Sequence, residues 1–556
     1  MKTMRCAMGL ALLAGLTALG CGAGGDDGAG DEGPACEGAK CDDPFAEGFE
    51  AANVCVGVRG NGELIFAHFA SLARIVEHYG LVAGYSGGSS ASITGFILES
   101  TQLNPAIESC AEAPCTPAEQ AARVAFLLKS MQGYVQVLAG TDEAMAVQQL
   151  IPLAQRVQEQ GLATLAVDDV EAARVALLDI LTSDELGDLI NPEVLALLTD
   201  SEAPTYHVRD IIDALSGFGS FSADDPKILV RPGFIDFQAF ARKIGRIANF
   251  YAGYGPWDEA AVTALLDACA VPSRGLSWAE AAALPAGETT CGQMYGDIVT
   301  AYRDALVADE ADFPSRTDDE VGAWIPSLIS TSVLTGESVA AWEAARAQYL
   351  SGTDPQLAVA FDDVRFGYWG LDIDLDAVAR NERGYDDLKT AKFLALGEAT
   401  WGHALSYSPA EPGLTRALEL PDGNVSAGGW SDLHPTLALH NLGCEKVVYV
   451  SRRGEDSSFS QGVATMLGMS ADERTALYDH TTDSAYDRSI READAVWCTD
   501  WNNQKATDLA GVFADAYGAP MVTSDPAFTE GETAYTNVQP DLDVVGCASQ
   551  SGASAE

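Results

Sequence analysis

The stretch Leu81-Val82-Ala83-Gly84-Tyr85-Ser86-Gly87-Gly88-Ser89-Ser90-Ala91-Ser92-Ile93 decides the fold of this chain. A short apolar strand at 81–85 runs into glycines and serines, and Ile93, Phe96 and Ile97 then form the apolar stripe of a helix. A strand, a sharp turn of small residues and a helix in this order expose a serine at the end of a parallel sheet, next to a helix amino terminus. We therefore predict an α/β fold with a candidate nucleophile in this turn.

Two serines of this stretch compete for the role of nucleophile. Ser86 lies in Gly84-Tyr85-Ser86-Gly87-Gly88, which matches the pattern G-x-S-x-G literally. A turn at Ser86 would cut the strand short and would put two glycines into the first helical turn, where glycine is costly. A turn at Ser90 leaves a strand of full length and starts the helix at Ala91. Ser90 is therefore the predicted nucleophile.

A second strand, at 53–58, precedes this one and leads into the loop Gly60-Asn61-Gly62. The following residues predict a helix, because Ile65, Phe69 and Leu72 share one face. A serine that attacks an acyl group needs donors for the oxyanion that forms. The backbone N–H groups of Gly60, Asn61 and Gly62 are the predicted donors, since glycine lets the backbone approach closely.

The middle of the chain is richer in helix than its two ends. Thr116-Pro117-Ala118-Glu119 is a capping box with proline at the first helical position, and alanine-rich helical stretches follow. Strand patterns return at 446–450 and 495–498. The sheet is therefore predicted to be assembled from both ends of the mature chain. The predicted divisions are a signal peptide at 1–20, a flexible acidic tether at 21–50, a first part of the core at 51–100, a mainly helical insertion at 101–400, a second part of the core at 401–545 and a flexible tail at 546–556.

The amino terminus has the layout of an export signal. Lys2 and Arg5 precede an apolar run at 8–20, and Cys21 follows directly after small residues. This order resembles a bacterial lipoprotein signal, which implies a lipid on Cys21 and a place in the cell envelope, as an outer-membrane lipoprotein. An ordinary secreted product is the alternative. No later stretch has the roughly 18 to 20 apolar residues that a membrane-spanning helix needs.

The cysteines fit an oxidising compartment, in which disulfides persist. Short loops predict three local pairs, and the remaining cysteines on strands fit either disulfides or buried thiols. The predicted pairs are Cys36 with Cys41, Cys110 with Cys115, and Cys269 with Cys291, and the remaining cysteines are Cys55, Cys444, Cys498 and Cys547.

The charge balance excludes one class of partner. The 32 Lys and Arg residues stand against 81 Asp and Glu residues, a formal net charge of −49. Nucleic-acid-binding proteins need a basic face to replace phosphate counterions, so we expect no nucleic-acid partner. The sequence has neither a glycine-rich loop with the Lys-Ser/Thr ending of a phosphate site nor a paired His/Cys set, so we expect no cofactor and no catalytic metal.

Several stretches, in order along the chain, resemble the patatin-like phospholipase family. They resemble its glycine-rich oxyanion loop and first helix, its nucleophile turn, its small-residue and proline stretch, and its D-G-G loop with the strand behind it. The stretches are Gly60-Asn61-Gly62 with Ala67-His68, then Gly88-Ser89-Ser90-Ala91-Ser92, then Ser406-Tyr407-Ser408-Pro409, and then Gly428-Gly429-Trp430-Ser431-Asp432-Leu433-His434-Pro435 before the strand at 446. Together they cover about 53–100 and 400–450.

This resemblance implies a three-layer α/β/α core with a mostly parallel sheet. It also implies lipid metabolism: a serine hydrolase of phospholipase or lysophospholipase type that cleaves a lipid ester through an acyl-Ser90 intermediate. In the family an aspartate directly before the two glycines is the base of a Ser-Asp dyad. Ala427 stands at that position here.

Three hypotheses follow from the absence of this aspartate. Asp432, five residues further along the same loop, takes over as base. Alternatively a histidine does, since His434, His440 and His480 all follow Ser90 in chain order. In the third hypothesis the protein keeps the fold without the activity and acts as a surface binding or structural lipoprotein. Asp432 also fits a simpler role as the cap of the helix that begins near Pro435.

Overall fold

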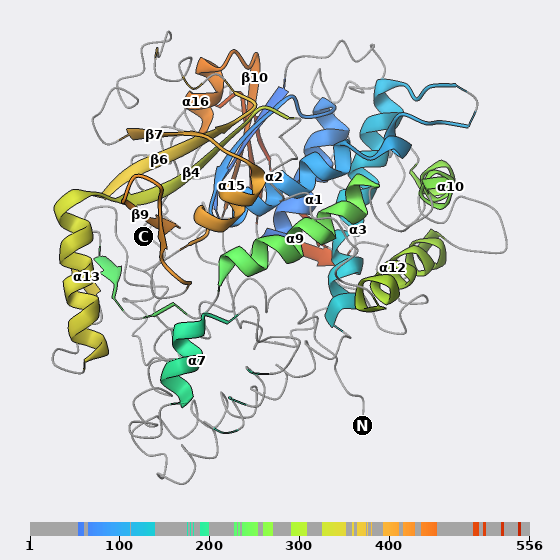
Figure 1. Cartoon of the computed structure of the whole chain (residues 1–556). Coiled ribbons are helices and arrows are strands. Elements are labelled where there is room, and N and C mark those ends of the chain that lie inside the picture. Colours follow the sequence, from blue (N-terminus) through green and yellow to red (C-terminus); the bar gives the residue numbers. More distant parts are fainter. Residues whose placement is uncertain are drawn as a thin grey trace, which may run out of the picture.

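A computed structural model describes the part of the chain that forms the sheet and its covering helices (Figure 1). The described residues are 54–60, 65–111, 113–139, 190–199, 227–230, 232–233, 236–253, 259–270, 291–308, 325–351, 358–360, 364–373, 393–410, 415–428, 435–452, 493–499, 504–506, 524–526 and 543–545, with the single positions 175, 178, 182, 375 and 380.

The described elements begin with alternating strands and helices and end with a succession of strands. The helices are α1 (Ile65–Tyr79), α2 (Ser90–Gln102), η3 (Pro105–Ile107), α3 (Pro117–Ala139), α7 (Pro192–Thr199), α9 (Phe237–Ala252), α10 (Glu259–Cys269), α12 (Cys291–Ala308), α13 (Gly336–Leu350), α15 (Trp401–Tyr407) and α16 (Pro435–Asn441). The strands are β1 (Val54–Val58), β2 (Gly84–Gly88), β3 (Lys227–Leu229), β4 (Ser327–Leu334), β5 (Ala358–Ala360), β6 (Val364–Leu371), β7 (Phe393–Glu398), β8 (Leu418–Glu419), β9 (Val425–Gly428), β10 (Lys446–Arg452), β11 (Ala495–Thr499), β12 (Gln504–Ala506), β13 (Ser524–Pro526) and β14 (Asp543–Val545).

The main sheet has the order β14-β11-β10-β1-β2-β4-β6-β7. The six strands from β14 to β4 are parallel, β6 is antiparallel to β4, and β7 is parallel to β6. β1 lies between β2, which is close in sequence, and β10, which comes from the other end of the chain. The prediction of an α/β protein whose sheet is assembled from both chain ends is thus confirmed.

Helices cover both faces of this sheet. Val54, Val56 and Val58 alternate along β1 and pack into the large core that also contains side chains of α1 and α2. Cys55 points to the opposite face, where Leu439 of α16 covers it. Burial on both faces explains why β1 is a continuous apolar run, as is usual for strands of parallel sheets.

The segment 101–400, expected to be a mainly helical insertion, includes strands of the main sheet among its described residues. It contributes α3, α9, α10, α12 and α13, but it also contributes β4, β6 and β7 to the main sheet. β4 has the sequence SLISTSVL, in which polar Ser and Thr interrupt the apolar residues. These hydroxyl side chains interrupt the apolar pattern that predicts a strand, and the hydroxyls of Ser327 and Thr331 form hydrogen bonds inside the fold.

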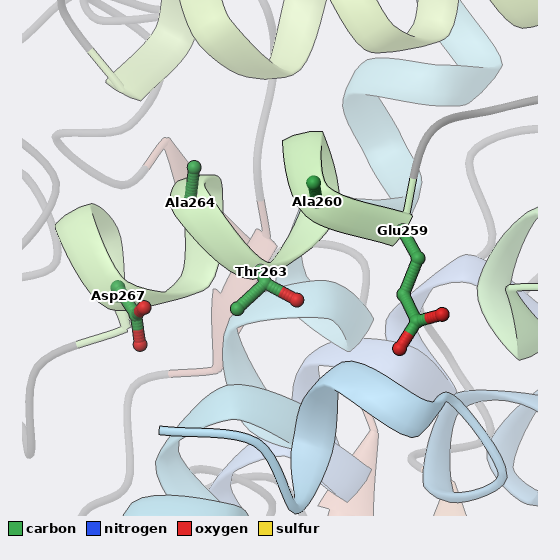
Figure 2. A pocket seen from close by; sticks show the side chains of 5 residues that line it. All are labelled: Glu259, Ala260, Thr263, Ala264 and Asp267. Atoms are coloured by element: carbon green, nitrogen blue, oxygen red, sulfur yellow. The ribbon is translucent and has the colours of Figure 1, made fainter. Parts of the chain in front are cut away.

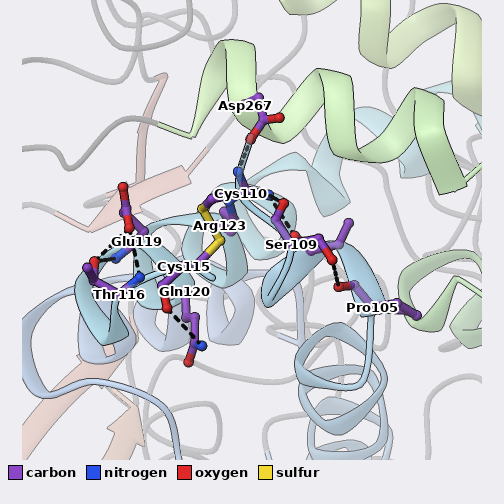
Figure 3. The surroundings of a disulfide bond; sticks show 10 residues. Pro105, Ser109, Cys110, Cys115, Thr116, Glu119, Gln120, Arg123 and Asp267 are labelled. Carbon is purple, nitrogen blue, oxygen red and sulfur yellow. Dashed lines mark hydrogen bonds and ion pairs between the residues drawn. A yellow bond between two sulfur atoms is a disulfide. The ribbon is translucent and has the colours of Figure 1, made fainter. Parts of the chain in front are cut away.

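The loop before α3 forms as expected. Cys110 and Cys115 form a disulfide, which confirms the predicted pair (Figure 3). The backbone N–H of Thr116 donates to the Glu119 carboxylate at 2.7 Å and lowers the pKa of that carboxyl, and the Thr116 hydroxyl does the same at 2.8 Å. The amide of Glu119 donates back to the Thr116 hydroxyl at 3.3 Å, which completes the predicted capping box.

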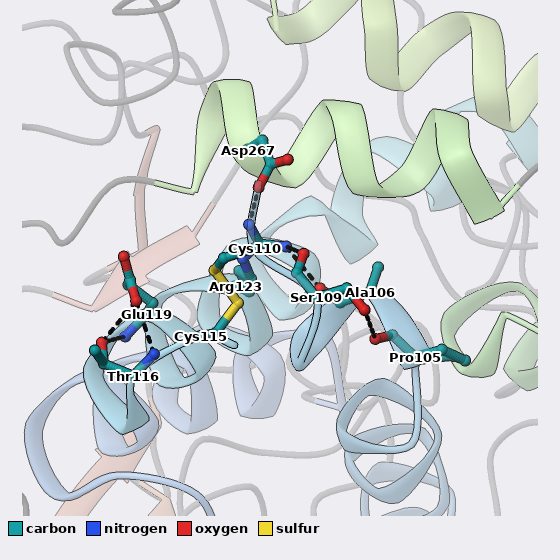
Figure 4. A network of polar contacts seen from close by, with 9 residues as sticks. All are labelled: Pro105, Ala106, Ser109, Cys110, Cys115, Thr116, Glu119, Arg123 and Asp267. Atoms are coloured by element: carbon teal, nitrogen blue, oxygen red, sulfur yellow. Dashed lines mark hydrogen bonds and ion pairs between the residues drawn. A yellow bond between two sulfur atoms is a disulfide. The ribbon is translucent and has the colours of Figure 1, made fainter. Parts of the chain in front are cut away.

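Arg123 of α3 ties this loop to α10. Its guanidinium donates to the carbonyls of Ala106 at 2.6 Å and Ser109 at 3.0 Å, and it pairs with Asp267 (Figure 4). Arg123 is only 3% exposed, so these contacts satisfy a charge that would be costly to bury alone.

A second disulfide joins the two halves of the sheet. Cys55 of β1 bonds to Cys444, which lies just before β10, over a sequence separation of 389 residues. The sequence left these two cysteines open between a disulfide and buried thiols. Cys269 is also disulfide-bonded, which is compatible with the Cys269–Cys291 pair, and that pair stays a prediction. The Cys36–Cys41 pair lies outside the described residues as well.

The long-range disulfide should contribute much more stability than the local one. A chain-entropy relation gives about 6 kcal/mol for a loop of 389 residues and about 2 kcal/mol for a loop of five. We expect the double variant Cys55→Ala/Cys444→Ala to lose clearly more free energy of unfolding than Cys110→Ala/Cys115→Ala. Urea unfolding followed by fluorescence measures both. Equal losses for the two variants would contradict this expectation.

Candidate functional site

The turn between β2 and α2 is a single strained residue. β2 ends at Gly88, α2 begins at Ser90, and Ser89 between them has φ 54° and ψ −128°. Positive φ is uncommon for residues other than glycine and costs about 1–3 kcal/mol. Such strain persists only where surrounding contacts hold it, and it is concentrated at functional sites. Ser89 is partly exposed, and its hydroxyl bonds to no described residue.

The other two serines of the stretch occupy different places. Ser86 lies inside β2, is 1% exposed, and is paired in register with Gly57 of β1, so the strand does run its full length past it. Ser90 is the first residue of α2 and is 6% exposed. A strand, a turn and a helix are therefore present in the predicted order, but the strand lies at 84–88 instead of 81–85, and the strained position is one residue before the predicted nucleophile.

Tight packing accounts for the small residues around this turn. A Cβ atom on Gly84 would lie 2.6 Å from the sulfur of Cys55, and one on Gly87 would lie 2.9 Å from the Cβ of Ala91. The Tyr85 hydroxyl donates to the Ala91 carbonyl at 2.6 Å. Burial raises the pKa of the Tyr85 phenol well above its usual range, so this donor keeps its proton.

Gly60, the first residue of the predicted oxyanion loop, lies directly against the turn. A Cβ atom at Gly60 would be 2.7 Å from the carbonyl oxygen of Gly88 and 3.1 Å from the Cβ of Ser89. Arg59, just before it, is 3% exposed, and its backbone N–H donates to the Val450 carbonyl at 3.0 Å. The structure thus brings Gly60 and Ser89 together. Asn61 and Gly62 lie outside the described residues.

β9, whose last residue is Gly428, shares one edge of β4 with β2. β6 pairs with the other edge of β4 over its whole length. On the shared edge, Gly88 of β2 pairs with Ser330, and Gly428 of β9 pairs with Ser332. Because β2 is parallel and β9 antiparallel to β4, their carboxyl ends face each other across Thr331. The chain beyond Gly428 therefore leaves its strand beside the residue that follows Gly88.

Hydroxyl groups join these strands beneath the turn. The Ser89 backbone N–H donates to the Ser408 hydroxyl at 2.8 Å, and that hydroxyl donates to the Ser330 carbonyl at 2.6 Å. The hydroxyls of Thr331 and Ser426 lie 2.8 Å apart. Ser426 also donates to the carbonyl of Tyr407, the residue before Ser408, at 2.7 Å.

His68 stands behind the first turn of α2. It is fully buried, and its Nδ1 lies 2.9 Å from the Thr94 hydroxyl, which donates to the Ser90 carbonyl at 3.2 Å. The sequence pointed to His68 only as part of the helix after the oxyanion loop. Its contacts in the structure support the helix that carries the turn.

One of the histidines considered as a base lies at the wrong end of the sheet. His440 is 3.9 Å from the Asp494 carboxylate, which accepts the backbone N–H of Val447 near the start of β10. Through the register of β10, β1 and β2, Val447 is level with Gly84, so Ser89 lies more than about 13 Å further along the strands. His440 therefore does not contact either serine of the turn. Asp432, His434 and His480 lie outside the described residues, as does Cys21.

The described residues offer little elsewhere that resembles a site. No group of three or more His, Cys, Asp or Glu among them could hold a metal ion, and none of their helices is long and apolar enough to cross a membrane. A shallow, open depression on α10 is lined by Glu259, Thr263 and Asp267, whose side chains follow one face of that helix (Figure 2). Asp267 is already paired with Arg123.

Comparison of the chain with models of protein families, with curated proteins and with solved structures found no match.

A methyl group at position 60 should disturb the turn more than the fold. Gly60→Ala places its Cβ against the Gly88 carbonyl and Ser89, so the loop or the turn must shift. We expect the rate at which a fluorophosphonate labels the protein to fall at least about tenfold. Gly370→Ala is the matched control, because its Cβ would press on Ile373 and Leu375, and Gly370 is paired with Leu328 near the start of β4. If both variants label at the rate of the parent protein, Gly60 has no part in the site.

Proposed function

We propose that this protein is a serine acyl hydrolase, a carboxylic ester hydrolase similar to the patatin-like phospholipases, that cleaves a lipid ester of phospholipid or lysophospholipid type. The observation that carries the proposal is the strained, partly exposed serine between a buried parallel strand and a helix amino terminus. The glycine of the predicted oxyanion loop packs directly against it. No cofactor takes part in this chemistry.

The geometry favours Ser89 over Ser90 as the nucleophile. Ser89 is the residue with positive φ between the strand and the helix, its Cβ lies beside Gly60, and its hydroxyl bonds to no described residue. Ser90, the residue predicted from the sequence, begins the helix and is 6% exposed, which leaves little access for a substrate. The adjacent position in the same turn thus takes the role expected of Ser90.

The reaction follows the usual course of a serine esterase. The Ser89 oxygen attacks the ester carbonyl carbon, and its proton passes to a base while an oxyanion forms. The backbone N–H groups of Gly60, Asn61 and Gly62 are proposed to stabilise that oxyanion. Breaking the ester C–O bond releases the alcohol, which takes up the proton. Water then attacks the acyl-serine and releases the carboxylic acid.

Asp432 is the proposed base. Ala427 cannot accept a proton, and His440 lies at the other end of the sheet. β9 ends at Gly428 beside the turn, and Asp432 follows four residues later, which is within reach of Ser89 for a chain spanning about 3.3 Å per residue.

Serine variants decide between the positions. A fluorophosphonate should label the parent protein on Ser89, as read by peptide mapping, and Ser89→Ala should abolish labelling and ester hydrolysis. Ser90→Ala should keep both within about tenfold, since it loses one hydroxyl next to the reacting group without losing the nucleophile. Its neighbouring position makes Ser90→Ala the matched control.

Each other outcome has a definite meaning. A label on Ser90, lost in Ser90→Ala, would restore the sequence prediction. A folded parent protein that takes no label and hydrolyses no lipid ester would overturn the enzymatic proposal. It would favour the alternative, an inactive patatin-like lipoprotein that serves as a binding or structural module.

We also propose that the protein is held in the bacterial cell envelope by a lipid on Cys21. The disulfides Cys55–Cys444 and Cys110–Cys115 support export, because such bonds persist in oxidising compartments. The lipid anchor would place the enzyme next to its substrate.

Cys21→Ser tests the anchor. Growth with a fatty-acid analogue should tag the parent protein, while Cys21→Ser should carry no tag and should leave the membrane fraction, because the thiol that accepts the lipid is gone. Cys6→Ser, in the signal itself, is the control and should be tagged normally. A parent protein that is untagged and free of the membrane would show an ordinary secreted product.

A further inference from the structure

We infer that Ser408 is the positioning residue that holds the candidate nucleophile in its strained conformation. This inference rests on the proposed function for its chemical part. Ser408 follows the end of α15 and is fully buried, so it does not meet a substrate. Its hydroxyl instead connects the turn to the sheet.

The Ser408 hydroxyl is both an acceptor and a donor of hydrogen bonds. It accepts the Ser89 backbone N–H at 2.8 Å and donates to the Ser330 carbonyl at 2.6 Å. Ser330 is the register partner of Gly88, the residue just before the turn. Direct pairing between β2 and β4 ends at Gly88. One residue later, the Ser408 hydroxyl bridges the Ser89 amide to β4 instead.

The position of Ser408 is itself fixed from both ends of α15. At the start of that helix, the indole N–H of Trp401 donates to Glu99 of α2 at 2.8 Å. At its end, the Tyr407 carbonyl accepts the hydroxyls of Ser426 at 2.7 Å and Thr331 at 3.4 Å. α15 thus lies antiparallel to α2, with its first residue near Glu99 and its last turn near Ser89. α2, which follows Ser89, and α15, which precedes Ser408, are thus hydrogen-bonded to each other at both ends.

Strain explains why such a holder is needed. A serine at φ 54° relaxes toward negative φ unless other contacts oppose it. Removing the Ser408 hydroxyl leaves the Ser89 N–H and the Ser330 carbonyl without this partner, and rotation of the Ser89 backbone would move the Ser89 side chain, whose Cβ lies beside Gly60. A displacement of this kind lowers the rate of a positioned reaction far more than it lowers substrate binding.

The experiment compares Ser408→Ala, Ser408→Thr and Ser406→Ala with the parent protein. Ser406 lies on the same helix, and its hydroxyl donates only to the Gly402 carbonyl of that helix in the described structure, so Ser406→Ala controls for loss of a hydroxyl from α15. We expect Ser408→Ala to label with a fluorophosphonate at least about tenfold more slowly, with kcat reduced and KM nearly unchanged. Ser408→Thr keeps the hydroxyl and should recover most of the rate.

Hydrogen exchange gives a second readout that needs no activity. In the peptide that spans residues 86–92, the Ser89 amide should exchange at least about tenfold faster in Ser408→Ala than in the parent protein, and at the parent rate in Ser406→Ala. Unchanged exchange and labelling in Ser408→Ala would overturn the inference, as would equal effects of Ser408→Ala and Ser406→Ala. If exchange is faster in Ser408→Ala but the parent protein takes no label, the contact between Ser408 and Ser89 is supported and the proposed hydrolase activity is rejected.

Discussion

The buried carboxylate of Glu99 sets the relation between α2 and two distant segments. It is fully buried, and it accepts the backbone N–H of Ile325 and the indole N–H of Trp401, each at 2.8 Å. Ile325 lies just before β4, and Trp401 begins α15. A buried carboxylate that lost these donors would be strongly destabilising, so the three elements are tied to one another.

The candidate site depends on that arrangement. β2 pairs with the first half of one edge of β4 and β9 with the second half of the same edge, so that β2 and β9 meet end to end at Thr331. With α15 against α2, Ser408 reaches the amide of Ser89, 319 residues away in sequence. The strain at Ser89 is therefore maintained by contacts from segments far away along the chain, which is how a rigid scaffold holds an unfavourable backbone conformation.

The sequence predicted well those features that a local pattern encodes. The buried strand at Val54–Val58 has an unbroken apolar run, the Thr116 capping box has its characteristic spacing, and Cys110 and Cys115 are close enough to pair without other help. The same approach missed β4, because its polar residues obscure the apolar pattern of a strand. It also left Cys55 and Cys444 undecided, since nothing near either residue indicates the other.

The sequence by itself determined that the chain is an α/β protein with a serine turn between a buried strand and a helix. It also determined that the chain is strongly acidic and contains a local disulfide. Tertiary structure alone decided which serine of that turn is strained, because Ser89 and Ser90 differ by one residue in a run of small side chains. The choice depends on where β2 ends, which pairing with β4 fixes, and on the Ser408 hydroxyl that holds the Ser89 amide. Such long-range hydrogen bonds leave no periodic or local trace in a sequence.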